Sequence, residues 1–111
     1  MTPDQTDIPI VAVDLDGTLA EPVWNVPGRK LSIGMPIRSG FEKLEKIVAA
    51  GWEPVIHTSR AWWAYDDIKT YMAMNGYPNI RIICGKFLAA AYIDDRAINA
   101  TDPDWTPQPF V

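Results

Sequence analysis

The feature that most constrains the fold is an apolar run that ends on two carboxylates. The run from Ile10 to Val13 is followed directly by the sequence Asp-Leu-Asp-Gly-Thr, which begins at Asp14. A continuous stretch of Ile, Val and Ala is typical of a strand covered on both faces, as in a parallel sheet. Carboxylates at the exit of such a strand lie where open α/β sheets bind their ligands. The alternative is a simple turn, because Asp and Gly are common turn formers.

Strands are expected to recur along the rest of the chain. Short apolar stretches predict further strands at Glu53 to His57, Ile80 to Cys84 and Ala90 to Ile93. With a helix between successive strands, this order predicts a three-layer, Rossmann-like α/β fold. Its sheet is expected to be mostly parallel, with about four strands.

Two helices are predicted between these strands. Ser39 as N-cap and Glu42 at the third helical position form a capping box, and Gly51 supplies a left-handed stop. A second helix is expected from about Trp62 to Asn75. The stretch from Ala20 to Arg38 is rich in Pro and Gly, shows no sustained periodicity and is expected to form a long loop or flap.

The size and charge of the chain limit its possible functions. Its 111 residues suffice for one domain, with a core at about 8–97 and an irregular proline-rich tail at 102–111. The net charge of −4 and the absence of a Lys/Arg run argue against binding to duplex nucleic acid. No apolar stretch approaches the ~20 residues of a membrane span. Because Cys84 is the only cysteine and the N-terminus does not resemble a signal peptide, we expect a cytoplasmic protein.

Chemically distinctive residues follow each predicted strand. They are Asp14 and Asp16 after the first, Thr58, Ser59 and Arg60 after the second, Lys86 after the third, and Asp94 and Asp95 after the fourth. The ends of parallel strands meet at one edge of a sheet, so these side chains are expected to converge. Converging carboxylates repel one another unless a cation lies among them, and Mg²⁺ prefers oxygen ligands of this kind.

The residues at these strand ends resemble the four motifs of the haloacid dehalogenase-like (HAD) hydrolase superfamily. The resemblance lies in the order of the motifs, in their placement after strands and in their residue types. The matching residues are Asp14-Leu15-Asp16-Gly17-Thr18, Thr58, Lys86 and Asp94-Asp95. The match extends from Ile8 to Ala97 and is similar to the small members that lack a cap domain.

The resemblance implies a Mg²⁺-dependent phosphomonoester hydrolase that acts through an aspartyl-phosphate. Asp14 would be the nucleophile, and Asp16 would protonate the leaving alcohol and then activate water. Thr58 and Lys86 would bind the phosphoryl oxygens, where donors stabilise the charge of the transferring group. Dehalogenating members of the family lack the second aspartate, so the presence of Asp16 favours phosphate chemistry.

The resemblance also implies the other contacts of the site. Mg²⁺ would be held by Asp14, Asp94 and the main-chain carbonyl of Asp16, with Asp95 acting through a water or positioning Lys86. The substrate, a small phosphorylated molecule, is expected to contact Leu15, Gly17, Ser59 and Arg60.

Other interpretations stay open. A phosphotransferase, or a phosphatase acting on nucleotides or polynucleotide ends, would use the same residues. A catalytically inactive domain that binds metal or phosphate is the alternative from another class, and Asp16 argues against it because binding alone needs no acid/base group. Arg60 could contact the substrate or pair with an acid.

The aromatic residues also allow two interpretations. Trp62 and Trp63 could pack in the core or form a stacking wall for a sugar or base. Without a cap domain, something else must cover the site, and the candidates are these two residues, the flap around Trp24 and the tail. Exposed aromatic residues would also favour a homo-oligomer.

Overall fold

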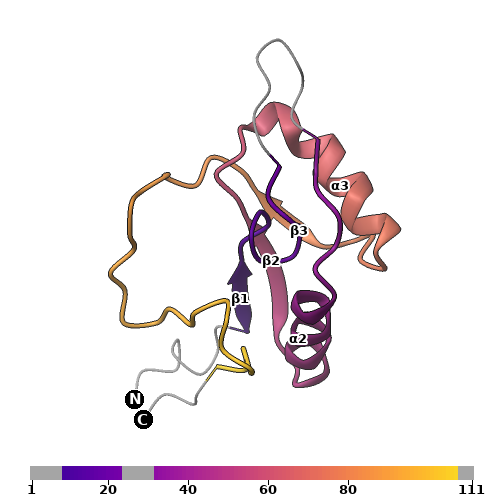
Figure 1. The fold of residues 1–111 in the computed structure, drawn as a ribbon. Helices are drawn as coiled ribbons and strands as arrows, with labels where there is room; N and C mark the ends of the chain where they lie inside the picture. Colours follow the sequence, from indigo (N-terminus) through magenta and orange to yellow (C-terminus); the bar gives the residue numbers. More distant parts are fainter. Residues whose placement is uncertain (1–8, 24–31, 108–111) are drawn as a thin grey trace.

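The computed structural model of the protein describes residues 9–23 and 32–107. These residues form a small α/β domain, drawn in Figure 1, with three strands, two α-helices and a short 3₁₀ turn. In chain order the elements are β1 (Ile10–Val13), α2 (Arg38–Ala49), β2 (Glu53–His57), η1 (Trp62–Ala64), α3 (Tyr65–Met74) and β3 (Arg81–Ile83).

The strands form one parallel sheet in the order β1-β2-β3. Val13 pairs with Ile56, and Ile56 pairs with Ile82, so these three side chains lie side by side on one face of the sheet. Each of them is at most 5% exposed. The α/β class and the parallel pairing predicted from the sequence are confirmed.

Both helices cover this same face, as Figure 1 shows. The contact residues recur at the spacing of one helical face: Leu44 and Ile47 in α2, and Ile68 and Met72 in α3. All four are fully buried, and they belong to the same core cluster as the sheet residues. Placing both helices on one side leaves the other face of the sheet to be covered by something else.

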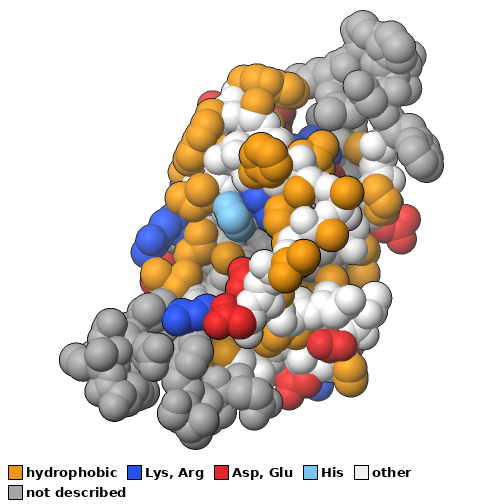
Figure 2. All heavy atoms as spheres, turned by 90° about the vertical axis from the view of Figure 1, so that its left-hand side faces the viewer, with side chains coloured by type: hydrophobic (Ala, Val, Ile, Leu, Met, Phe, Trp, Pro, Cys, Tyr) orange, Lys and Arg blue, Asp and Glu red, His pale blue; other side chains and the backbone are white. Residues whose placement is uncertain are grey.

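No helix among residues 9–23 and 32–107 covers the opposite face. Ala12, Val55 and Ile83 point to that side by strand alternation. Ala12 is exposed and Ile83 is 40% exposed, whereas Val55 in the central strand is 5% exposed. Figure 2 views the molecule from the left of Figure 1, which is the side away from the helices, and shows hydrophobic side chains spread over it. The predicted three-layer architecture is therefore wrong for the described chain, which has two layers.

The predicted fourth strand, Ala90 to Ile93, is not formed in the structure. Residues 84–100 contain no strand or helix and run as an open loop away from the sheet (Figure 1). Ile93 is 103% exposed, and Phe87 and Leu88 are each at least 80% exposed. Only residues 84–89 separate β3 from Ala90, whereas a crossover between parallel strands usually takes about 12 residues.

The chain returns to the body of the protein after this loop. The ammonium group of Lys43 in α2 donates to the carbonyl of Ala100 at 3.0 Å, and the indole of Trp105 donates to the same oxygen at 3.1 Å. Trp105 is 6% exposed and joins the core cluster. The tail is irregular, as expected, but it is anchored at Trp105. Trp24 and residues 108–111 lie outside the described part of the chain.

The start of α2 differs from the predicted capping box. Ile37 is the N-cap and makes no side-chain capping bond, so Ser39 lies in the first turn instead. The helix start is held by its approach to the loop after β1: the amide of Ile37 donates to the carbonyl of Leu19 at 2.8 Å. Gly40 is buried where a Cβ would lie 2.2 Å from the carbonyl oxygen of Thr18. Close backbone contact, rather than a side-chain cap, fixes this end.

In the part of the chain that the structure describes, neither helix has the length and apolar character needed to cross a bilayer.

Replacing Gly40 by Ala is expected to destabilise the protein, although Ala is the better helix former. The added methyl group meets the main-chain oxygen of Thr18, which cannot rotate away, so we expect a loss of about 1–3 kcal/mol in the free energy of unfolding. Urea unfolding measures it. The matched control is Ser39→Ala in the same turn, which should change stability by less than about 0.5 kcal/mol because Ser39 caps nothing. A Gly40→Ala variant as stable as wild type would contradict the close contact.

Candidate functional site

The loop after β1 is a tight turn built around the carbonyl of Leu15. That oxygen accepts the amides of Leu19 at 2.9 Å and Ala20 at 3.0 Å, while the Leu15 side chain is fully buried. Gly17 has φ of 80°, a left-handed conformation that favours glycine. Because Leu15 points inward, its neighbours in sequence, Asp14 and Asp16, are left partly exposed at the strand exit.

The two carboxylates have different partners. One oxygen of Asp14 accepts the amide of Leu15 at 2.8 Å. Both oxygens of Asp16 are held by Arg60: Nε donates to Oδ2 and Nη2 donates to Oδ1, each at 2.8 Å. Such a bidentate pair is among the stronger hydrogen-bonded contacts of proteins. Arg60 thus pairs with an acid, one of the two roles that the sequence left open.

Arg60 also connects the site to neighbouring segments. Its Nη2 donates to the carbonyl of Ser32 at 2.9 Å, and its side chain is 10% exposed. The pKa of Arg60 is raised above its ordinary value, mainly by the hydrogen bond to Asp16, while burial acts in the opposite direction. The guanidinium therefore stays charged and neutralises one of the two carboxylates at the exit of β1.

The exits of β2 and β3 are joined by backbone hydrogen bonds. The amide of Thr58 donates to the carbonyl of Ile83 at 3.0 Å. The amide of Lys86 donates to the carbonyl of Thr58, and the amide of Gly85 donates to the carbonyl of Arg60, each at 2.8 Å. Thr58 is fully buried, and its hydroxyl accepts the amide of Arg60 at 3.1 Å. The structure thus brings the backbones of Thr58, Arg60 and Lys86 together at the exits of β2 and β3. Ser59 lies between them and is exposed.

The side chain of Lys86 turns to the following loop. Its ammonium group lies over the ring of Tyr92, 4.5 Å from the centroid, and the Tyr92 hydroxyl donates to the carbonyl of Phe87. A cation over an aromatic ring is attracted by the ring quadrupole. This contact directs the Lys86 side chain to Tyr92 in the loop that follows β3.

The structure does not bring Asp94 and Asp95 to the other carboxylates. Both are exposed in the open loop, and an oxygen of Asp94 accepts the amide of Arg96 at 2.8 Å in a local turn. Within residues 9–23 and 32–107, no group of three or more acidic, His or Cys side chains could hold a metal ion. The predicted four-carboxylate site is therefore not assembled here, because Asp94 and Asp95 depend on a strand that has not formed.

Two contacts at the site were not anticipated from the sequence. The carbonyl of Ser32 meets Arg60, and the hydroxyl of Tyr71 donates to the carbonyl of Gly34 at 3.0 Å. Burial, and secondarily the charge of Asp16, raises the pKa of Tyr71. The helical spacing of Tyr71 predicts an inward position but gives no indication of which carbonyl it meets.

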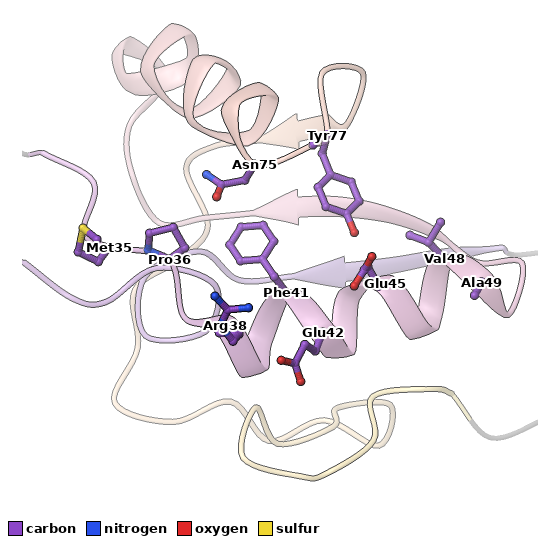
Figure 3. A pocket seen from close by; sticks show the side chains of 11 residues that line it. Met35, Pro36, Arg38, Phe41, Glu42, Glu45, Val48, Ala49, Asn75 and Tyr77 are labelled. Atoms are coloured by element: carbon purple, nitrogen blue, oxygen red, sulfur yellow. The ribbon is translucent and has the colours of Figure 1, made fainter.

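A separate groove of about 930 Å³ lies against α2, shown in Figure 3. Phe41 and Tyr77 form its aromatic floor, with ring centroids 6.2 Å apart, and Glu42 and Glu45 lie along its rim. None of the residues that line it was predicted to belong to the strand-end site.

Comparison with known proteins finds no match: no family of known sequences, no curated protein and no solved structure is significantly similar to the chain.

The pair formed by Asp16 and Arg60 is expected to be strongly coupled. A double-mutant cycle with Asp16→Asn and Arg60→Gln should give about 1–3 kcal/mol of interaction free energy, because Arg60 is mostly buried and bidentate. The control is the exposed pair Arg81 and Glu53, at 3.2 Å, for which we expect less than about 1 kcal/mol. Equal coupling in the two cycles, measured by urea unfolding, would show that Arg60 does not hold Asp16 as described.

Proposed function

We propose that the chain is a Mg²⁺-dependent phosphomonoester hydrolase of the HAD type, acting through an aspartyl-phosphate on Asp14. The observation that carries the proposal is the exit of β1, where Asp14 is partly exposed beside the joined exits of β2 and β3. One Asp14 oxygen accepts the Leu15 amide, which leaves the other to attack phosphorus.

The proposed reaction has two steps. In the first, an Asp14 oxygen bonds to phosphorus while the ester P–O bond breaks, and the leaving oxygen takes a proton from Asp16. In the second, water bonds to phosphorus and gives a proton to Asp16, and the acyl-phosphate P–O bond breaks to release phosphate and Asp14. Thr58 and Lys86 would bind the phosphoryl oxygens, and Mg²⁺, which Asp14 and Asp94 would hold, would supply positive charge that balances the transferring group.

Asp16 can act as an acid only if its pair with Arg60 opens. Both Asp16 oxygens accept hydrogen bonds from Arg60, so neither can carry a proton toward a leaving group in this arrangement. A substrate phosphate is also an anion that binds a guanidinium in a bidentate way. We therefore assign Arg60 a switching role, in which the phosphate draws it from Asp16.

The proposal also places Ala90 to Ile93 beside β1 as a fourth parallel strand. Among the described residues β1 pairs only with β2, so its other edge is open. To reach that position from Ile83, the chain must pass β2 and β1, which is three strand spacings, and return to the other end of the sheet, which is one strand length. The straight-line distance is roughly 19 Å. The chain between Ile83 and Ala90 reaches up to about 23 Å when extended, so forming this strand requires the amides of Gly85 and Lys86 to leave the carbonyls of Arg60 and Thr58.

The bare face of the sheet suits this path. A crossover that returns from β3 to the far side of β1 is right-handed only if it passes over the face without helices. Phe87 and Leu88 would then cover apolar residues of that face such as Ala12 and Ile83. Asp94 would follow the new strand at the same edge as Asp14, and the carboxylates would then fit the oxygen ligands that Mg²⁺ requires.

Asp14→Asn is expected to reduce Mg²⁺-dependent hydrolysis of p-nitrophenyl phosphate by at least about 1,000-fold, because an amide of the same size cannot attack phosphorus. The melting temperature should be unchanged or slightly raised, because the substitution removes a negative charge beside Asp16. The matched control is Asp102→Asn in the exposed tail, which should retain wild-type activity. Activity of Asp14→Asn within tenfold of wild type would exclude the covalent route. A wild-type protein without hydrolase activity would favour the alternative of a catalytically inactive domain that binds metal or phosphate.

The fourth strand predicts protection of specific amides. Addition of Mg²⁺ with orthovanadate, a phosphate analogue, should slow hydrogen exchange of residues 90–95 at least tenfold, because their amides would pair with β1 or lie beneath the bound anion. Asp94→Asn should lose most of this protection and should weaken Mg²⁺ binding in calorimetry. The buried amides of β2 serve as the internal control. Unchanged exchange at residues 90–95 in the active protein would exclude the strand.

A further inference from the structure

An exposed group of aromatic side chains follows Arg60 and is not explained by the core. Trp62 is 56% exposed and Trp63 is 62% exposed. The rings of Trp62 and Tyr65 are stacked, with centroids 6.1 Å apart and planes at 26°. These three residues, with Asp66 and Ile82, line an open hollow of about 580 Å³, which we call the aromatic hollow. Large rings left in water beside a hollow are typical of a binding surface.

The aromatic hollow lies next to the residues proposed to bind phosphate. A Cβ added to Gly85 would lie 3.6 Å from the indole nitrogen of Trp62, so the indole lies against the chain just before Lys86. The amide of Gly85 donates to the main-chain carbonyl of Arg60 at 2.8 Å, so the segment that Trp62 contacts is also bonded to a residue of the candidate site. The hollow is at the β3 side of the sheet, and Asp14 is at the exit of β1, roughly 10 Å away by two strand spacings.

The side chains that line the aromatic hollow suit a ligand with a planar ring that carries hydrogen-bond donors. An indole stacks on any planar ring, and such stacking is tolerant of the ring's identity. Asp66 is exposed at the hollow, and its carboxylate is an acceptor, so it complements the N–H groups of a nucleobase. At the other end, Arg60 and Lys86 would supply positive charge to an anion once they leave Asp16 and the Tyr92 ring. A ribose between the base and the phosphate supplies the spacing between the two ends.

We propose that the aromatic hollow binds the base of a nucleoside monophosphate, with Trp62 as the stacking platform and Asp66 as the acceptor, while the phosphate lies at Asp14. This assignment rests on the proposed function for the phosphate end only. The base end stands on Trp62, Tyr65 and Asp66, none of which takes part in the proposed reaction. A base stacked on Trp62 would also cover one side of the site, which has no cap domain.

The experiment compares AMP with ribose 5-phosphate, which differs only by the missing base. Wild-type protein with Mg²⁺ should show a kcat/KM at least about tenfold higher for AMP, and Trp62→Ala should lower the value for AMP about tenfold while leaving ribose 5-phosphate unchanged. Trp62→Phe, which keeps a ring, should retain most of the preference. Met74→Ala is the control, because Met74 is 81% exposed on α3 and lies outside the hollow.

Calorimetry with the Asp14→Asn variant separates binding of the base from the reaction. AMP should bind at least tenfold more tightly than ribose 5-phosphate, and Trp62→Ala should remove the difference. If no phosphomonoester is hydrolysed but this binding difference is seen, the hydrolase is refuted and the base site stands. If both compounds are hydrolysed or bound equally, or if Trp62→Ala lowers both equally, the base site is refuted and the hydrolase stands.

Discussion

The right-handed rule for crossovers between parallel strands determines most of this structure. Because the strand order β1-β2-β3 advances in one direction, both crossover helices must lie on the same face. Every core contact of α2 and α3 is therefore made with one side of the sheet, through Val13, Ile56 and Ile82. The other side can be covered only by a chain that runs back in the opposite direction, and the only described chain left for this follows β3.

The same topology explains why the candidate site lies where it does. Parallel strands end at one edge, so the residues after β1 and β2 meet there without any need for the intervening sequence. Backbone bonds between Thr58, Lys86 and the end of β3 then fix the register of this edge. Arg60 adds a bidentate contact with Asp16, which neutralises one of the two carboxylates at the exit of β1.

The sequence predicts local features of the fold better than those that depend on distant segments. The apolar runs at Ile10 and Val55 predict their strands, and Gly51 and Gly76 stop their helices with φ of 96° and 97°. Ser39 was misassigned as a cap because a capping box is a pattern of side chains, whereas this helix start is fixed by backbone contacts to Leu19 and Thr18. These contacts join segments about 20 residues apart in the chain, so a capping pattern read from neighbouring residues cannot predict them.

The candidate site follows the same division. Thr58 and Lys86 come together because both adjoin strands that form, and residues of that kind can be predicted from a strand boundary alone. The partner of Arg60 could not be chosen, because the choice between Asp16 and a ligand depends on the path of the loop through Ser32. Asp94 and Asp95 were placed by a strand whose formation depends on a short link crossing an entire face, which is a tertiary condition.

Two groups of apolar side chains in the described residues are exposed to water, which is unfavourable for the folded state. Phe87, Leu88 and Ile93 leave apolar area in water in the open loop after β3, and Trp62 does so beside β3. Burial of an apolar side chain contributes about 1.5–3 kcal/mol, so either group would stabilise a state in which it is covered. The first can be covered by the sheet face that has no helices, whereas Trp62 is stacked on Tyr65 and would be covered by the base proposed above. In the proposed complex, a phosphate at Asp14 and a planar ring at Trp62 would belong to one substrate that lies along the same edge of the sheet. On the proposed function, the open state described here is the state expected before a substrate binds, with Arg60 paired to Asp16 until a phosphate draws it away.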